Sequence, residues 1–114
     1  MPTDEYYREL DQLSKLHKDA IERLACAGVL DRNAFEEYRN AAAAFVKTSQ
    51  SHSLVSKRAL QLINSAITYC QCNAEYSSDQ VFIDDFGRYM AHVFYCIIGD
   101  EDLDDRQAGI PRII

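Results

Sequence analysis

The residues best suited to chemistry in this chain are its four cysteines and three histidines. Cys70 and Cys72 are two positions apart, and His92 and Cys96 are four positions apart. Positions i and i+2 of a helix point about 200° apart, so Cys70 and Cys72 cannot hold one ion there. Zinc sites have two well-spaced ligand pairs, which this pattern lacks. We therefore expect free thiols, with no metal and no other cofactor.

Catalytic patterns are equally weak in this sequence. His17 lies in the middle of an apolar stripe, where a buried histidine bonded to a neighbour is a simpler interpretation than a ligand or a pH switch. Asp84 and Asp85 do not form a catalytic dyad, because adjacent residues of a helix diverge by about 100°. The sequence has no nucleophile elbow and no phosphate-binding glycine motif. We predict that the protein is not an enzyme.

Acidic charge is concentrated in the last third of the chain. Residues 1–72 carry nine acidic and nine basic residues, whereas residues 73–114 carry nine acidic residues and three arginines. Five of these acids form a run without the spacing or the glycine of a calcium loop, namely Asp100, Glu101, Asp102, Asp104 and Asp105. A solvated stretch is the simplest interpretation of the run, and a surface for a basic partner is the alternative. This charge disfavours direct nucleic-acid binding.

Four amphipathic helices are predicted to position these residues, at 4–27, 32–48, 54–72 and from a capping box at Ser77 to about 98. Asp31 is the expected N-cap of the second helix, and Gly28 ends the first. The third helix has the broadest apolar face, which predicts that it is the central one. Short loops favour an all-α fold, an antiparallel four-helix bundle (residues 1–99) with a C-terminal tail (residues 100–114), in a single domain.

One face of the fourth helix is predicted to be exposed. Asp84, Arg88, Ala91 and Tyr95 lie opposite the predicted core stripe, which comprises Phe82, Phe86, Tyr89, Met90, Val93 and Ile97. An exposed tyrosine beside a charge pair is typical of interface hot spots, although single surface tyrosines are also common. The predicted partner-binding residues are Asp84, Asp85, Arg88, Tyr95, Asp100, Glu101, Asp102, Asp104 and Asp105. The apolar end of the tail, Ile110, Ile113 and Ile114, is expected to dock on the bundle or on a partner.

These features predict a small, acidic, non-catalytic protein that binds and inhibits or neutralises another protein with a basic surface. An immunity protein, an antitoxin or a phage inhibitor such as an anti-CRISPR has this character. Two alternatives stay open: a homo-oligomeric structural or adaptor protein that pairs through Ala41–Ala44 or Tyr95, and a small helical metal-binding protein or enzyme. The sequence shows no secretory signal and no membrane-spanning run, and its cysteines suit a reducing compartment, so we expect a cytoplasmic location.

Overall fold

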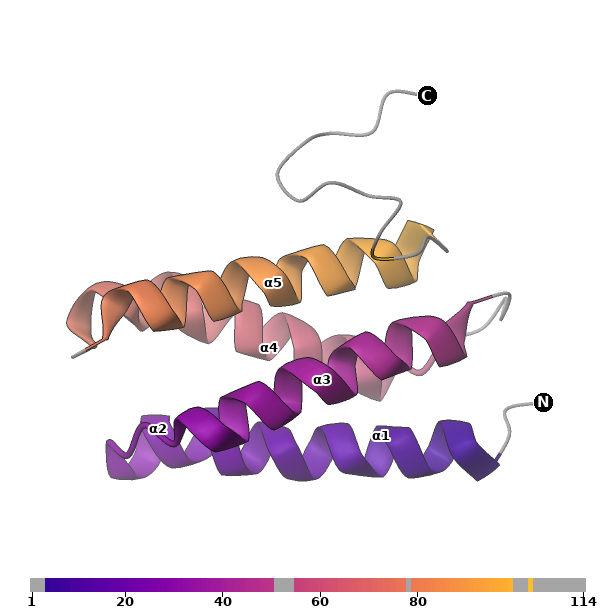
Figure 1. Cartoon of the computed structure of the whole chain (residues 1–114), viewed down its shortest axis with the longest axis horizontal. Helices are drawn as coiled ribbons and strands as arrows, with labels where there is room; N and C mark the ends of the chain where they lie inside the picture. Colours follow the sequence, from indigo (N-terminus) through magenta and orange to yellow (C-terminus); the bar gives the residue numbers. More distant parts are fainter. Residues whose placement is uncertain (1–3, 51–54, 78, 100–102, 104–114) are drawn as a thin grey trace.

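The computed structural model describes residues 4–50, 55–77, 79–99 and 103. Across these residues every regular element is a helix (Figure 1), so the all-α prediction is confirmed. The elements are α1 (Asp4–His17), the π-turn η1 (Lys18–Glu22), α2 (Arg23–Ala27), α3 (Arg32–Ser49), α4 (Lys57–Asn73), the 3₁₀ turn η2 (Ala74–Tyr76) and α5 (Gln80–Gly99). No helix within the described ranges combines the length and the apolar character that crossing a membrane requires.

The first three elements form one continuous rod. The backbone keeps right-handed helical angles through His17, Glu22 and Arg23, so neither end of η1 breaks the helix. A π-turn places one more residue in a turn than an α-helix does, and it therefore rotates the face that follows. α-Helical spacing from Leu13, His17 and Ala20 would put Ala27 on the apolar face, but after this rotation Ala27 is exposed.

Local signals end the first rod and begin α3. Gly28 has a left-handed φ of 67°, and its N–H donates to the carbonyl of Leu24. This is a glycine cap, which ends α2 where the sequence predicts. The carboxylate of Asp31 accepts a hydrogen bond of 3.2 Å from the N–H of Ala34, which confirms Asp31 as the N-cap of α3.

The start of α4 differs from the prediction. The helix begins at Lys57 rather than at residue 54, because the hydroxyl of Ser56 accepts a hydrogen bond from the N–H of Ala59 and caps it. Val55, which the sequence places in the helix, precedes it. The N–H of Ser56 also donates to the Tyr6 hydroxyl at 2.7 Å, which holds the start of α4 beside the start of α1.

The helices form two hairpins that lie side by side. One hairpin pairs the α1–α2 rod with α3, and the other pairs α4 with α5. Figure 1 shows consecutive helices running in opposite directions. Between the hairpins α1 contacts α4 and α3 contacts α5, and these neighbours run in the same direction. Each rod therefore has two neighbours, so α4 is not the central helix that its broad apolar face predicts.

A continuous core joins the two hairpins. On α3 the apolar residues that recur at helical spacing are all buried: Phe35, Tyr38, Ala42, Phe45 and Val46. The core stripe of α5 is shifted from the predicted one. Phe86, Met90, Val93 and Ile97 are buried as expected, and Ile83 and Cys96 are buried as well.

Phe82 and Tyr89, which the sequence assigns to the core stripe of α5, are only partly buried. Each ring lies beneath an arginine of α3. The guanidinium of Arg32 is 4.8 Å from the ring centre of Phe82, and that of Arg39 is 4.0 Å from the ring centre of Tyr89. These two residues of α5 therefore form the rim of its contact with α3.

Candidate functional site

Asp79 fixes the start of α5, the helix that carries the candidate site. Its Oδ1 accepts a hydrogen bond of 3.2 Å from the N–H of Phe82, and its carboxylate forms an ion pair with Arg32 of α3. The predicted capping box is wrong in its register. The hydroxyl of Ser77 accepts instead from the N–H of Asp79 at 3.2 Å, and α5 begins at Gln80. α5 is therefore tied to α3 at its first turn.

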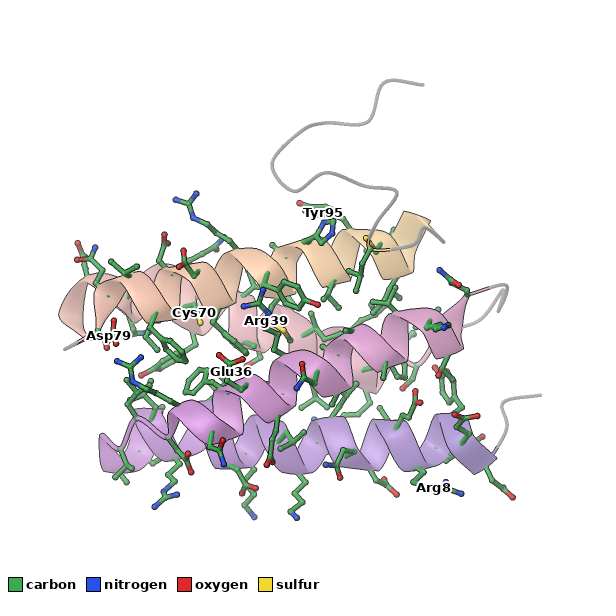
Figure 2. The ribbon with its side chains drawn as sticks, viewed as in Figure 1. Arg8, Glu36, Arg39, Cys70, Asp79 and Tyr95 are labelled. Carbon is green, nitrogen blue, oxygen red and sulfur yellow. The ribbon has the colours of Figure 1, made fainter. Side chains whose placement is uncertain are left out.

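The side of α5 that faces away from the core is rich in exposed side chains. Figure 2 shows Tyr95 on the side of α5 that points away from α3. Val81, Tyr95 and Ile98 are 72%, 55% and 60% exposed, so three large apolar residues lie exposed on this one helix. Asp84 and Arg88 are exposed as predicted. We define the α5 outer surface as Val81, Asp84, Asp85, Arg88, Tyr95 and Ile98.

Charge occupies the middle of the α5 outer surface. Nε of Arg88 donates to Oδ2 of Asp84 at 2.9 Å, and both side chains are well exposed, at 78% and 48%. Asp85 is exposed and forms no ion pair with any residue that the structure describes. Val81 lies before these charges, and Tyr95 lies after them by about 10 Å of helix. The surface therefore combines an excess of negative charge with apolar ends.

The sequence analysis missed Val81 and Ile98 as members of this surface. Helical spacing contained the signal, because Val81 precedes Asp84 by three positions and Ile98 follows Tyr95 by three positions. Their exposure is a result of how α5 is seated on α3 and α4.

The acidic run lies outside the described residues, as does the apolar end of the tail. These residues are Asp100, Glu101, Asp102, Asp104 and Asp105 in the run, and Ile110, Ile113 and Ile114 after it. Leu103 is described, and it packs against the core cluster. Its carbonyl lies 3.0 Å from Nε2 of His92, so residue 103 returns to the surface of α5.

The cysteines and His92 do not assemble into a metal site. Among the described residues no group of three or more histidine, cysteine, aspartate or glutamate side chains could hold an ion. Cys70 and Cys96 are buried, whereas Cys72 is exposed. Burial raises the pKa of the Cys70 thiol, the negative charge of Asp84 acts in the same direction, and together they bring it to about 12. Cys70 is therefore a protonated, unreactive thiol at neutral pH.

His17 is a core residue, as the simpler interpretation expects. It is 6% exposed, and its Nδ1 lies 2.8 Å from the hydroxyl of Tyr38. That hydroxyl in turn donates to the carbonyl of Leu62 at 3.4 Å, so the network links α1, α3 and α4. Burial lowers the pKa of His17, the carboxylate of Glu22 raises it and Arg58 lowers it again. The neutral imidazole is favoured, and its role here is structural.

Comparison with known proteins yields no relative for this arrangement. No family model matches the chain, and no curated protein or solved structure gives a significant match.

Proposed function

We propose that the protein is a non-catalytic binding domain that covers a basic surface of another protein through the α5 outer surface and thereby inhibits or neutralises that protein. The observation that carries the proposal is the exposure of Val81, Tyr95 and Ile98 on one helix, beside acidic side chains. Burying such residues against a partner removes apolar area from water, which drives association. Tyrosine is also among the residues enriched in interface hot spots.

The charge of this region supports a basic partner. All of the net charge of −6 arises in residues 73–114. Within the described part of that segment, Glu75, Asp79, Asp84 and Asp85 outnumber Arg88. An excess of negative charge speeds the approach of a basic surface and suppresses binding to an acidic one. Carboxylates on such a surface can also occupy a site that accepts phosphate groups, which gives a route to inhibition of a nucleic-acid-handling protein.

The test is a capture experiment with a reversed charge on this surface. Tagged wild-type protein and the double variant Asp84→Lys, Asp85→Lys are used to recover proteins from the source cells at low salt, followed by a high-salt wash. We expect the wild type to retain a stoichiometric basic protein that the wash releases, because 1 M salt shortens the range of charge interactions to about 3 Å. The double variant loses this protein.

A matched control separates the α5 outer surface from acidity in general. Glu36 and Glu37 are also adjacent, acidic and exposed, but they lie on α3. The variant Glu36→Lys, Glu37→Lys has the same net charge as the α5 variant and should keep the partner. Equal capture by all three proteins contradicts the proposal. Recovery of the bait alone, as a dimer that survives high salt, replaces it with the homo-oligomeric alternative.

A further inference from the structure

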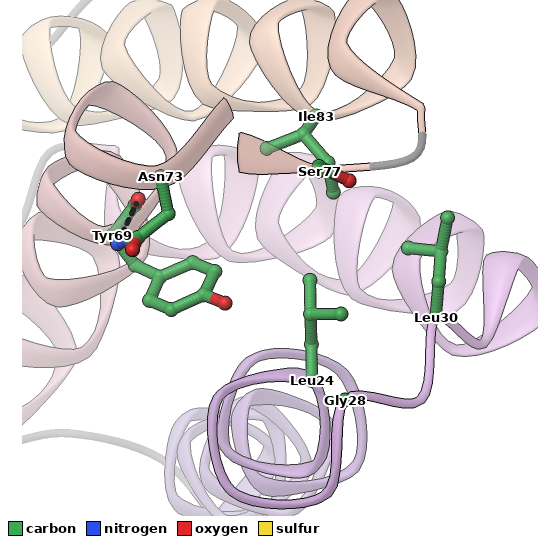
Figure 3. Close-up of a pocket in the computed structure, with 7 residues that line it drawn as sticks. All are labelled: Leu24, Gly28, Leu30, Tyr69, Asn73, Ser77 and Ile83. Carbon is green, nitrogen blue, oxygen red and sulfur yellow. Dashed lines mark hydrogen bonds between the residues drawn. The ribbon is translucent and has the colours of Figure 1, made fainter. Parts of the chain in front are cut away.

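A pocket lies at the end of the bundle where α2 ends and α5 begins. Figure 3 shows the side chains of Leu24, Tyr69 and Ile83 converging on one space. The cavity volume is about 230 Å³, and its lining residues are Leu24, Gly28, Leu30, Tyr69, Asn73, Ser77 and Ile83. They come from the first rod, the loop after it, α4, the segment after η2 and α5. The pocket therefore exists only in the assembled bundle.

Polar groups at this pocket retain hydrogen-bonding capacity. The hydroxyl of Tyr69 forms no hydrogen bond with the residues that the structure describes. Nδ2 of Asn73 donates to the carbonyl of Tyr69 at 2.9 Å, whereas its Oδ1 has no donor within the described residues. Ser77 accepts from the N–H of Asp79, which leaves its own hydroxyl proton available. A ligand would thus meet a phenol, an amide oxygen and a hydroxyl.

The size and charge of the pocket limit its ligand. The pocket is partly open to solvent, and its volume of about 230 Å³ exceeds the about 150 Å³ of an enclosed apolar cavity that accepts benzene, so it has room for a second ring. No acidic or basic side chain is among the residues that line it. Burial raises the pKa of Tyr69, with the neighbouring thiols of Cys70 and Cys26 acting in the same direction, so its hydroxyl stays protonated. A charged ligand would lose part of its hydration on entering the pocket and would find no opposite charge there.

We propose that this pocket binds a neutral, two-ring aromatic molecule that carries one hydrogen-bonding N–H or O–H group. Leu24 and Leu30 contact its rings, and the Tyr69 hydroxyl accepts its proton. The ligand joins the two hairpins at this end of the bundle, away from Tyr95 and Ile98 near the end of α5. The site is independent of the proposed protein-binding function, because none of its lining residues belongs to the α5 outer surface.

The test uses indole as the probe and two-dimensional amide NMR of the full chain as the readout. We expect saturable shifts confined to residues around the pocket. Tyr69→Phe keeps the ring and removes the hydroxyl, so it should weaken indole about five-fold, the equivalent of one net hydrogen bond. Tyr7→Phe, at an exposed tyrosine of α1, is the matched control and should leave the affinity unchanged.

Two further comparisons make the result decisive. Leu24→Phe fills the pocket and should abolish the saturable shifts, whereas Leu10→Phe, at another partly buried leucine of the same rod, should not. Thermal unfolding of each variant confirms that it is folded. Indole-3-carboxylate should bind at least about ten-fold more weakly than indole, because its charge has no partner in the pocket. Shifts that do not saturate, or that persist unchanged in Leu24→Phe, overturn the proposal.

Discussion

At the scale of single residues, two buried contacts join helices through residues far apart in the sequence: His17 with Tyr38, and Gly87 with Cys70. His17 joins the hydroxyl of Tyr38 and, through it, the carbonyl of Leu62. Because burial is the largest influence on its pKa and lowers it, the folded state disfavours the imidazolium. His17 is therefore a source of pH-dependent stability rather than a binding group.

The stability of the protein should fall as the pH drops below 6.5, the ordinary pKa of histidine. In that range the unfolded chain takes up a proton at His17 before the folded chain does, which favours unfolding. Above it both states are neutral and the contribution is complete. One such group changes the free energy of unfolding by at most about 1.4 kcal/mol per pH unit. Urea unfolding at pH 7.5, 6.5 and 5.5 measures this, and His17→Asn should flatten the dependence. Identical slopes for the two proteins would contradict it.

The second contact is between Gly87 and Cys70. A Cβ atom on Gly87 would lie 2.6 Å from Cβ of Cys70, a separation that real side chains do not adopt. α5 therefore packs closely against α4 at Gly87, where it has no side chain; Figure 2 labels Cys70 of α4.

Gly87→Ala gives a test in which two effects have opposite signs. Helix propensity alone favours alanine by about 1 kcal/mol. The clash with Cys70 forces α4 and α5 apart, and overpacking of this kind costs about 1–3 kcal/mol. We expect net destabilisation in urea unfolding. A variant that is more stable than the wild type would show that the helices separate freely at this point.

At the scale of elements, the parallel helices α3 and α5 make the same kind of contact twice, seven residues apart. Arg32 covers Phe82, and seven residues later on both helices Arg39 covers Tyr89. A seven-residue step returns each helix to nearly the same face, so the two cation–π pairs have the same register. They align α5 against α3 along the side of the bundle.

The contribution of the second pair can be measured in a double-mutant cycle. Arg39→Met and Tyr89→Leu keep the apolar bulk and remove the interaction. We expect a coupling energy of about 0.5–1 kcal/mol in the free energy of unfolding. Arg23→Met combined with Tyr89→Leu is the control cycle, because Arg23 pairs with Asp31 instead. Equal coupling in both cycles would argue against a specific contact.

Two variants of Asp79 show how α5 is anchored, because Asp79 both caps the helix and pairs with Arg32. Asp79→Ala removes both interactions and should cost about 0.5–2 kcal/mol of stability, the usual value for an N-cap. Asp79→Asn keeps a capping oxygen and loses only the ion pair. Because Arg32 is 60% exposed, that pair is worth at most about 1 kcal/mol. Equal losses for the two variants would show that the ion pair, not the cap, anchors the helix.

At the scale of the whole molecule, stability and the proposed binding surface are separate. The core runs through both hairpins and includes Ile63 at 0% exposure, whereas Asp84 and Asp85 face solvent. Ile63→Ala should cost about 2–5 kcal/mol in the free energy of unfolding. The double variant Asp84→Lys, Asp85→Lys should cost less than about 1 kcal/mol, because it removes one exposed ion pair. A large loss in the charge variant would mean that its binding defect reports unfolding.

Much of this molecule follows from local patterns in the chain. Apolar spacing and the caps Gly28 and Asp31 predict the number of helices and most of their ends, since these properties depend on residues within one or two turns of each other. The exposure of Asp84, Arg88 and Tyr95 follows from the same periodicity.

Which helices become neighbours depends on long-range packing that no local pattern contains. Pairing of α1 with α4 and of α3 with α5 depends on contacts between residues far apart in the chain, such as Tyr6 with Ser56 and Arg39 with Tyr89. The close approach at Gly87 and the pocket beside Tyr69 also form only where residues of different elements meet. The π-turn is also not indicated by the sequence, because its residues include no glycine or proline. Periodicity describes one helix at a time, and packing of the helices determines what their faces meet.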